Sequence, residues 1–249
     1  MSTASHPDPA LQLTTVGRGR PALILHGAPG PQSITGYVDH LAARHYVLAP
    51  THPGWDGTSR PDWCDTVADL ALTYLDLLED RDLRDVALVG TSFGGWVAAE
   101  TAVRDRGARI SNLILIDAIG PHIPGQPVRA PAGPPPGGPL PPAEPGSPAA
   151  PGPARRGPSP QDMAALTAYA GASMGDPKLL RRLTRVRIPT HVLWGEKDQV
   201  VTPDFGRAYA AAFPRAHFEL IKGAGHQPVR DNPEATYAAI DKFLTRGDS

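Results

Sequence analysis

The chain has 249 residues, a formal net charge of −1 and an apolar fraction of 41%, which is enough for one large α/β domain. A net charge this close to zero gives no indication that the chain binds nucleic acid or an anionic membrane surface. A single cysteine, Cys64, excludes an internal disulfide and a cysteine-rich metal site. No apolar run approaches the ~20 residues of a membrane span, and the N-terminus lacks a signal-peptide pattern, so we expect a soluble cytoplasmic protein.

Short apolar runs alternate with helical patterns along the chain. The runs that predict buried strands are 21–27, 45–52, 85–90, 110–118, 190–195 and 217–223. The segments with a helical pattern are 65–78, 93–107, 203–213 and 232–244. Strands buried on both faces, alternating with helices, predict an α/β fold with a mostly parallel sheet between two layers of helices.

One segment interrupts this alternation. Residues 129–160 contain thirteen prolines and six glycines. Proline removes a backbone donor and clashes with the preceding helical turn, so neither a helix nor a paired strand is expected there. The expected organisation is a single core of residues 1–120 and 188–249 with an insertion at 121–187, disordered over 121–160 and helical over 161–187.

The sequence GTSFGG, residues 90–95, carries the main indication of chemistry. It matches G-x-S-x-G with Ser92 at the centre, an apolar strand before it and a helical pattern after it. Its glycines allow a turn tight enough to force the central residue into a strained conformation. Such a turn presents Ser92 at the carboxyl edge of the sheet and at a helix N-terminus, which favours a developing negative charge. We therefore predict that Ser92 is a nucleophile.

A serine nucleophile needs a base, and the base needs an acid that fixes its orientation. His226 lies in the sequence KGAGHQP, which predicts a loop after the last predicted strand. A histidine in such a loop is a poor candidate for core packing. Asp198 and Asp117 each follow a predicted strand, so both are expected at the carboxyl edge of the sheet. We predict His226 as the base and Asp198 as the acid, with Asp117 as the competing acid.

The oxyanion that forms when a carbonyl is attacked needs hydrogen-bond donors. One predicted donor is the backbone N–H of Phe93, the residue after the nucleophile. The other is the backbone N–H of Ala28 in the loop HGAPGPQS, where Pro29 and Pro31 cannot donate.

Five motifs, in chain order, are HGAPG, THPGWDGTSRP, GTSFGG, WGEKDQVV and GAGHQP. In order and spacing they resemble those of the α/β-hydrolase superfamily, in which the nucleophile precedes the acid and the acid precedes the base. The resemblance covers the chain except for its N-terminal tail and the proline-rich tract. It implies the α/β-hydrolase fold with a Ser-Asp-His triad. One position departs from the family, because Asp56 stands where a glycine is usual, with Gly57 next, so we expect an altered turn.

The same resemblance bears on the insertion. Members of the superfamily carry a helical cap over the active site in the slot that residues 121–187 occupy here. Because its first part is rich in proline and glycine, we expect a reduced cap and an open entrance. A long proline tract also contains PxxP sequences, so a ligand for a partner domain is the competing interpretation.

The expected activity is that of a serine hydrolase of the esterase type. It would act on an ester-like carbonyl of a small to medium organic substrate through an acyl-enzyme, with no metal and no organic cofactor. The expected partner is the small-molecule substrate, and the sequence does not indicate an oligomeric state.

A C–C bond hydrolase of the β-diketone type is the alternative chemistry, although the loop after Gly27 lacks the asparagine common there. Perhydrolysis is expected only as a side reaction. A non-catalytic small-molecule-binding protein on the same scaffold is the alternative from another class.

Overall fold

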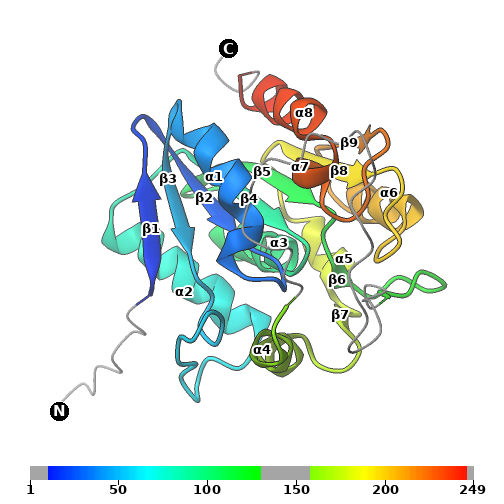
Figure 1. The fold of residues 1–249 in the computed structure, drawn as a ribbon, viewed down its shortest axis with the longest axis horizontal. Coiled ribbons are helices and arrows are strands. Elements are labelled where there is room, and N and C mark those ends of the chain that lie inside the picture. The colour runs from blue at the N-terminus through cyan, green and yellow to red at the C-terminus, as the bar shows by residue number, and fades with distance from the viewer. Residues whose placement is uncertain (1–10, 130–157, 246–249) are drawn as a thin grey trace, which may run out of the picture.

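The computed structural model describes residues 11–129 and 158–245. Its main sheet has seven strands in the order β1-β3-β2-β4-β5-β8-β9 (Figure 1). Every neighbouring pair is parallel except β1 and β3. The strands are β1 (Leu13–Val16), β2 (Arg20–Leu25), β3 (His45–Pro50), β4 (Val86–Thr91), β5 (Ile110–Ile116), β8 (Thr190–Gly195) and β9 (Ala216–Ile221). This sheet confirms the predicted fold class.

Helices cover both faces of the sheet, as Figure 1 shows. On one face lie α1 (Thr35–Ala42), which the 3₁₀ turn Pro31–Ile34 precedes, and α8 (Pro233–Thr245). On the other face lie α2 (Val67–Asp80), α3 (Phe93–Asp105) and α6 (Pro203–Ala211). A short helix, α7 (Pro228–Asp231), joins the loop after β9 to α8. None of the described helices has the length and apolar character that a membrane crossing requires.

Two apolar clusters form because successive side chains of a strand point to opposite faces. In β2, Leu23 and Leu25 pack toward α2 and α3, whereas Ala22 and Ile24 pack toward α1 and α8. All four side chains are fully buried. The unbroken apolar run in the sequence therefore reflects burial on both faces of the sheet.

The edge strand β1 is the one strand of this sheet without an apolar run. It pairs antiparallel with β3, and three of its four residues are exposed. Hydrogen bonds to β3 rather than burial of side chains place it, so the apolar pattern of the sequence does not indicate it.

The described part of the insertion contains α4 (Pro160–Ala170), α5 (Leu179–Leu183) and a parallel pair of two-residue strands, β6 (Gly120–Pro121) and β7 (Gly175–Asp176). Backbone hydrogen bonds hold residues 121–129 at both ends. His122 N donates to Asp176 O at 3.0 Å, and Arg129 N donates to Val200 O at 2.8 Å. For these nine residues the structure differs from the expected disorder, because backbone bonds to β7 and to the loop after β8 hold both ends. It also differs at residues 158–160, because Ser159 caps α4 and Pro160 is its first residue, where proline is tolerated. Residues 130–157 lie outside the described residues, so the expectation for them stays a prediction.

Side-chain contacts attach the second half of the insertion to the core. Arg182 of α5 pairs with the buried Glu100 of α3 and with Asp176. Tyr169 of α4 donates a hydrogen bond from its hydroxyl to Pro53 O at 3.1 Å. These contacts hold α4 and α5 on the side of the sheet that α3 covers.

Candidate active site

Ser92 lies at the sharp turn between β4 and α3. Its φ of 51° and ψ of −117° are unusual for a residue with a side chain, and Ser92 N donates to Ile116 O at 2.9 Å. A Cβ on Gly94 would collide with the carbonyl oxygens of Leu25 and His26. Only glycine therefore lets α3 begin this close to β2, which gives the physical reason for the G-x-S-x-G pattern.

The loops after three strands bring the predicted nucleophile, base and acid together. Ser92 follows β4, Asp198 follows β8 and His226 follows β9. His226 Nε2 lies 3.0 Å from Ser92 Oγ, and His226 Nδ1 lies 2.7 Å from Asp198 Oδ2. The imidazole can therefore accept the serine proton on one nitrogen while the carboxylate holds the other.

Backbone hydrogen bonds orient the carboxylate of Asp198. The side chain is fully buried, and Oδ1 accepts backbone hydrogen bonds from Val200 N at 2.8 Å and Val201 N at 3.1 Å. These bonds hold Oδ1 in place on the side away from His226. Its other oxygen, Oδ2, remains available to His226.

Asp117, the competing acid, lies beside this arrangement without joining it. The side-chain ligand atoms of Asp117, Asp198 and His226 lie within 4.8 Å of one another, but His226 Nδ1 bonds to Asp198. Asp117 Oδ1 instead accepts from Gly195 N at 2.8 Å. Burial, and then the neighbouring Asp198 carboxylate, raise the pKa of Asp117 well above its ordinary value. This environment disfavours the charged form of Asp117, which makes it the poorer partner for an imidazolium.

The loop that contains Ala28 approaches the nucleophile closely. A Cβ built on Gly27 would lie 3.0 Å from the Ser92 Cβ. Gly27 O accepts from Gly30 N at 3.1 Å, and the N–H of Ala28 belongs to the same planar peptide unit and points away from that carbonyl. The N–H of Phe93 is at the first position of α3, where no intrahelical acceptor exists. Phe93 directly follows Ser92, and Gly27, the residue before Ala28, approaches it closely, so the role of both N–H groups as oxyanion donors stays a prediction.

Buried histidines support this loop, and the sequence analysis missed them. His52 N donates to His26 Nε2 at 3.0 Å, so the neutral His26 ring carries its proton on Nδ1 and donates to Gly27 O at 2.8 Å. His52 Nε2 donates to His26 O at 3.0 Å, which leaves His52 Nδ1 to accept from the hydroxyl of Tyr74. Burial lowers the pKa of His26 to about 4, so the ring is neutral near neutral pH. The available sequence signal was the position of His26 directly before Gly27.

Trp55 also holds the loop. Its buried indole N–H donates to Ala28 O at 3.0 Å, and its ring stacks on Phe93 and on Tyr169 from the insertion. The next residue, Asp56, has a φ of 51°, a left-handed conformation that aspartate tolerates better than most residues. An aspartate therefore occupies a position with the backbone geometry that glycine favours.

The sequence matches one family over most of its length. The family described as "Alpha/beta hydrolase family" matches residues 22–239. Among curated relatives, a 1-acylglycerol-3-phosphate O-acyltransferase of Arabidopsis thaliana is 34% identical over 109 residues, 41% of this chain and 26% of that protein. The non-heme chloroperoxidase CPO-A1 of Kitasatospora aureofaciens is 35% identical over 114 residues, 42% of this chain and 39% of that protein. The chain thus spans well under half of either relative.

A solved structure matches over nearly the whole chain. A thermophilic esterase from Thermogutta terrifontis superimposes with a TM-score of 0.73 at 22% identity, over 96% of this chain and 94% of that one. At this identity the likeness concerns the fold alone.

Proposed function

Because the chain belongs to the alpha/beta hydrolase family, we propose that it is a serine hydrolase that cleaves an ester-like carbonyl of a small to medium organic substrate. The observation that carries the proposal is the hydrogen-bonded series of Ser92, His226 and Asp198 at the carboxyl ends of β4, β8 and β9. A protein that only bound a small molecule would not need a serine, an imidazole and a carboxylate in this geometry.

In the first half of the proposed reaction, His226 Nε2 takes the proton of Ser92 Oγ as that oxygen attacks the carbonyl carbon. The resulting oxyanion accepts hydrogen bonds from the N–H groups of Ala28 and Phe93, and each such donor is typically worth a factor of ~10²–10³ in rate. When the tetrahedral intermediate collapses, His226 gives the proton to the departing alkoxide. An alcohol leaves, and the acyl group remains on Ser92.

In the second half, water replaces the alcohol. His226 takes a proton from the water as its oxygen attacks the acyl carbon, and then returns the proton to Ser92 Oγ. The products are a carboxylic acid and the free enzyme. Asp198 stabilises the imidazolium in both halves and keeps its proton-bearing nitrogen fixed.

A fluorophosphonate probe tests the nucleophile. The proposal predicts covalent labelling of the wild-type protein and no labelling of Ser92→Ala. A folded wild-type protein that resists labelling would favour the non-catalytic binding protein instead. A series of p-nitrophenyl esters of graded acyl length then measures substrate size, and preference for a β-diketone over every ester would favour the C–C hydrolase.

Perhydrolysis is a second candidate, which the likeness to a non-heme chloroperoxidase favours. If hydrogen peroxide rather than water attacks the acyl carbon on Ser92, the product is a peracid, which can oxidise a halide. Peracid formation from an ester and hydrogen peroxide should then depend on Ser92 as ester hydrolysis does. Halide oxidation that persists in Ser92→Ala would rule out this route.

A further inference from the structure

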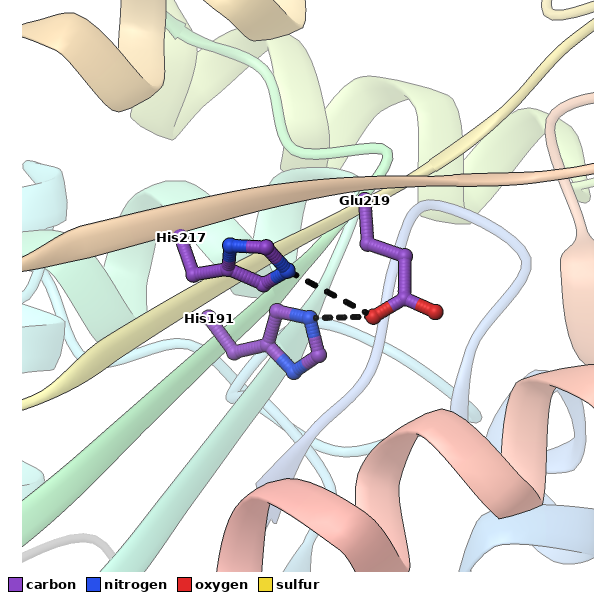
Figure 2. A group of neighbouring side chains, drawn as sticks. All are labelled: His191, His217 and Glu219. Atoms are coloured by element: carbon purple, nitrogen blue, oxygen red, sulfur yellow. Dashed lines mark hydrogen bonds and ion pairs between the residues drawn. The ribbon is translucent and has the colours of Figure 1, made fainter.

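Three side chains of types that can bind a metal ion converge on β8 and β9, away from Ser92. His191 and His217 are register partners in these parallel strands, and Glu219 follows His217 by two residues. Because side chains two apart on a strand share a face, all three point to the face that α8 covers. Figure 2 shows the two imidazole rings side by side with the Glu219 carboxylate beyond them.

The distances suit ligands of one small cation. His191 Nε2 lies 3.1 Å and His217 Nε2 3.8 Å from the same oxygen of Glu219, and the ligand atoms of all three lie within 4.8 Å of one another (Figure 2). Zn²⁺ binds nitrogen and oxygen ligands at about 2.0–2.2 Å in tetrahedral geometry, which separates the ligand atoms by about 3.4 Å. The two nitrogen–oxygen separations, 3.1 and 3.8 Å, lie on either side of this value, so small side-chain movements would bring all three atoms to ligand distance.

The surroundings let a cation in from solvent and let the ligands adjust. The three residues line a surface cavity of about 200 Å³ between β8, β9 and α8. The side chain of His191 is only 3% exposed, whereas those of His217 and Glu219 are 67% and 34% exposed. His191 is therefore fixed, with its ring 5.0 Å from that of Phe243, while the other two can move by the small distance that closure requires.

Two features limit the affinity. Lys242 of α8 lines the same cavity, and its charge opposes a bound cation. A metal on His191 Nε2 moves the ring proton to Nδ1, which is buried and has no hydrogen-bond partner among the described residues. Ligating histidines usually donate that proton to a neighbour, so we expect weaker binding than at structural zinc sites.

We propose that His191, His217 and Glu219 form a binding site for a divalent transition metal, with Zn²⁺ as the best fit. Two imidazoles, one carboxylate and an open position for water are a donor set that this ion accepts. The site would join β8 and β9, the strands whose carboxyl ends lead to Asp198 and His226. We expect a bound metal to affect stability rather than catalysis. The two histidines lie near the amino ends of their strands, whereas Ser92 lies at the carboxyl ends.

The test is a titration of the full chain with Zn²⁺ against a fluorescent chelator near neutral pH, together with thermal unfolding with and without Zn²⁺. Wild-type protein should bind one Zn²⁺ at this site and unfold at a higher temperature when loaded. His217→Ala and Glu219→Gln should each weaken binding by more than about 100-fold, because even residues outside the ligand set are worth about 10- to 100-fold. Ester hydrolysis by the metal-free variants should equal that of the metal-free wild type.

Matched variants separate this site from other histidine–carboxylate groups. His40→Ala removes a partly exposed histidine that pairs with Asp241, and should leave Zn²⁺ affinity unchanged. His226→Ala removes the other group of potential ligands, with Asp117 and Asp198, and should also leave it unchanged. Lys242→Gln should tighten binding.

Zn²⁺ binding that survives His217→Ala, or that disappears in His226→Ala, would overturn the proposal, as would the absence of binding to wild type. In that case Glu219 serves only as a hydrogen-bond partner of His191 and an ion-pair partner of His217.

Discussion

Asp117 and Asp198 have the same side chain and lie next to each other, but their surroundings differ. Two backbone N–H groups and His226 Nδ1 point at Asp198, whereas one backbone N–H points at Asp117. Burial raises the pKa of Asp117 well above its ordinary value, and only Asp198 holds the imidazole by a hydrogen bond. The two residues are therefore expected to contribute very differently to catalysis.

Replacement of each aspartate by asparagine tests this difference. Asp198→Asn should lower kcat for ester hydrolysis by about 10⁴, the size of the effect when a triad aspartate is replaced by its amide. Asp117→Asn should lower it by less than about tenfold, because His226 bonds to Asp198 and an amide oxygen can still accept from Gly195 N. Steady-state kinetics of both variants, with folding checked by circular dichroism, would decide. The reverse order of effects would assign the acid to Asp117.

The buried His26 predicts a loss of stability in acid. Its pKa is about 4 in the folded protein, because burial opposes the charged form, and about 6.5 in an unfolded chain. Above pH ~6.5 both states leave the ring neutral, but between pH ~6.5 and ~4 only the unfolded state binds the proton. The free energy of unfolding should fall by about 3 kcal/mol over this range from His26 alone.

Urea unfolding at several pH values measures this loss. The variant His26→Gln removes the titrating group, so its stability should fall less steeply between pH ~6.5 and ~4 than that of wild type. An unchanged slope in His26→Gln would mean that the ring is already protonated in the folded protein or that it titrates normally.

At the scale of elements, the sequence predicted most of those whose stability comes from burial. It missed α1, which buries Tyr37, Val38 and Leu41 within only eight residues. Six of the seven strands of the main sheet and helices α2, α3, α6 and α8 have an apolar run or an apolar helical face. By contrast, β1 and the two-residue strands β6 and β7 are placed by backbone hydrogen bonds to distant segments. No local pattern encodes those partners, because backbone groups are the same in every residue.

The start of α2 offers a test of a locally encoded element. Asp69 N donates to Thr66 Oγ1 at 3.2 Å, and Thr66 N donates to Asp69 Oδ2 at 2.9 Å, so each side chain caps the other residue's backbone. Thr66→Ala should lower the free energy of unfolding by about 1 kcal/mol. Thr167→Ala, the same change on an exposed turn inside α4, should leave it unchanged or slightly raise it, because alanine favours helix interiors. Chemical denaturation of both variants checks the pair, and equal effects would contradict a specific cap.

For the whole molecule, the main question is how much the proline-rich tract matters. Ser92 precedes it and Asp198 and His226 follow it, so both sides of the tract belong to one sheet. Closing a flexible loop depends weakly on its length, at about 0.6 kcal/mol for each doubling. We therefore expect that replacing residues 130–157 with a Gly/Ser linker of half the length changes the free energy of unfolding by less than about 1 kcal/mol.

Ester turnover by this linker variant should stay within a few fold of wild type, since α4 and α5 keep their contacts with the core. Thermal unfolding and p-nitrophenyl ester kinetics provide the measurement. Loss of folding would mean that the tract packs on the core, and loss of binding to a partner domain alone would support the PxxP interpretation.

The sequence by itself determined the sheet with its helices and the residues Ser92, Asp198 and His226 as candidates. Burial on two faces and a turn that requires glycine both leave local patterns in the chain. Only the tertiary structure decided that His226 Nδ1 pairs with Asp198 rather than Asp117, that His26 and Trp55 hold the loop of Ala28, and that His191, His217 and Glu219 meet. Each of these contacts joins segments that are far apart in the chain or depends on which atom faces which neighbour. Strand register and side-chain direction set such contacts, and neither can be deduced from the order of residues alone.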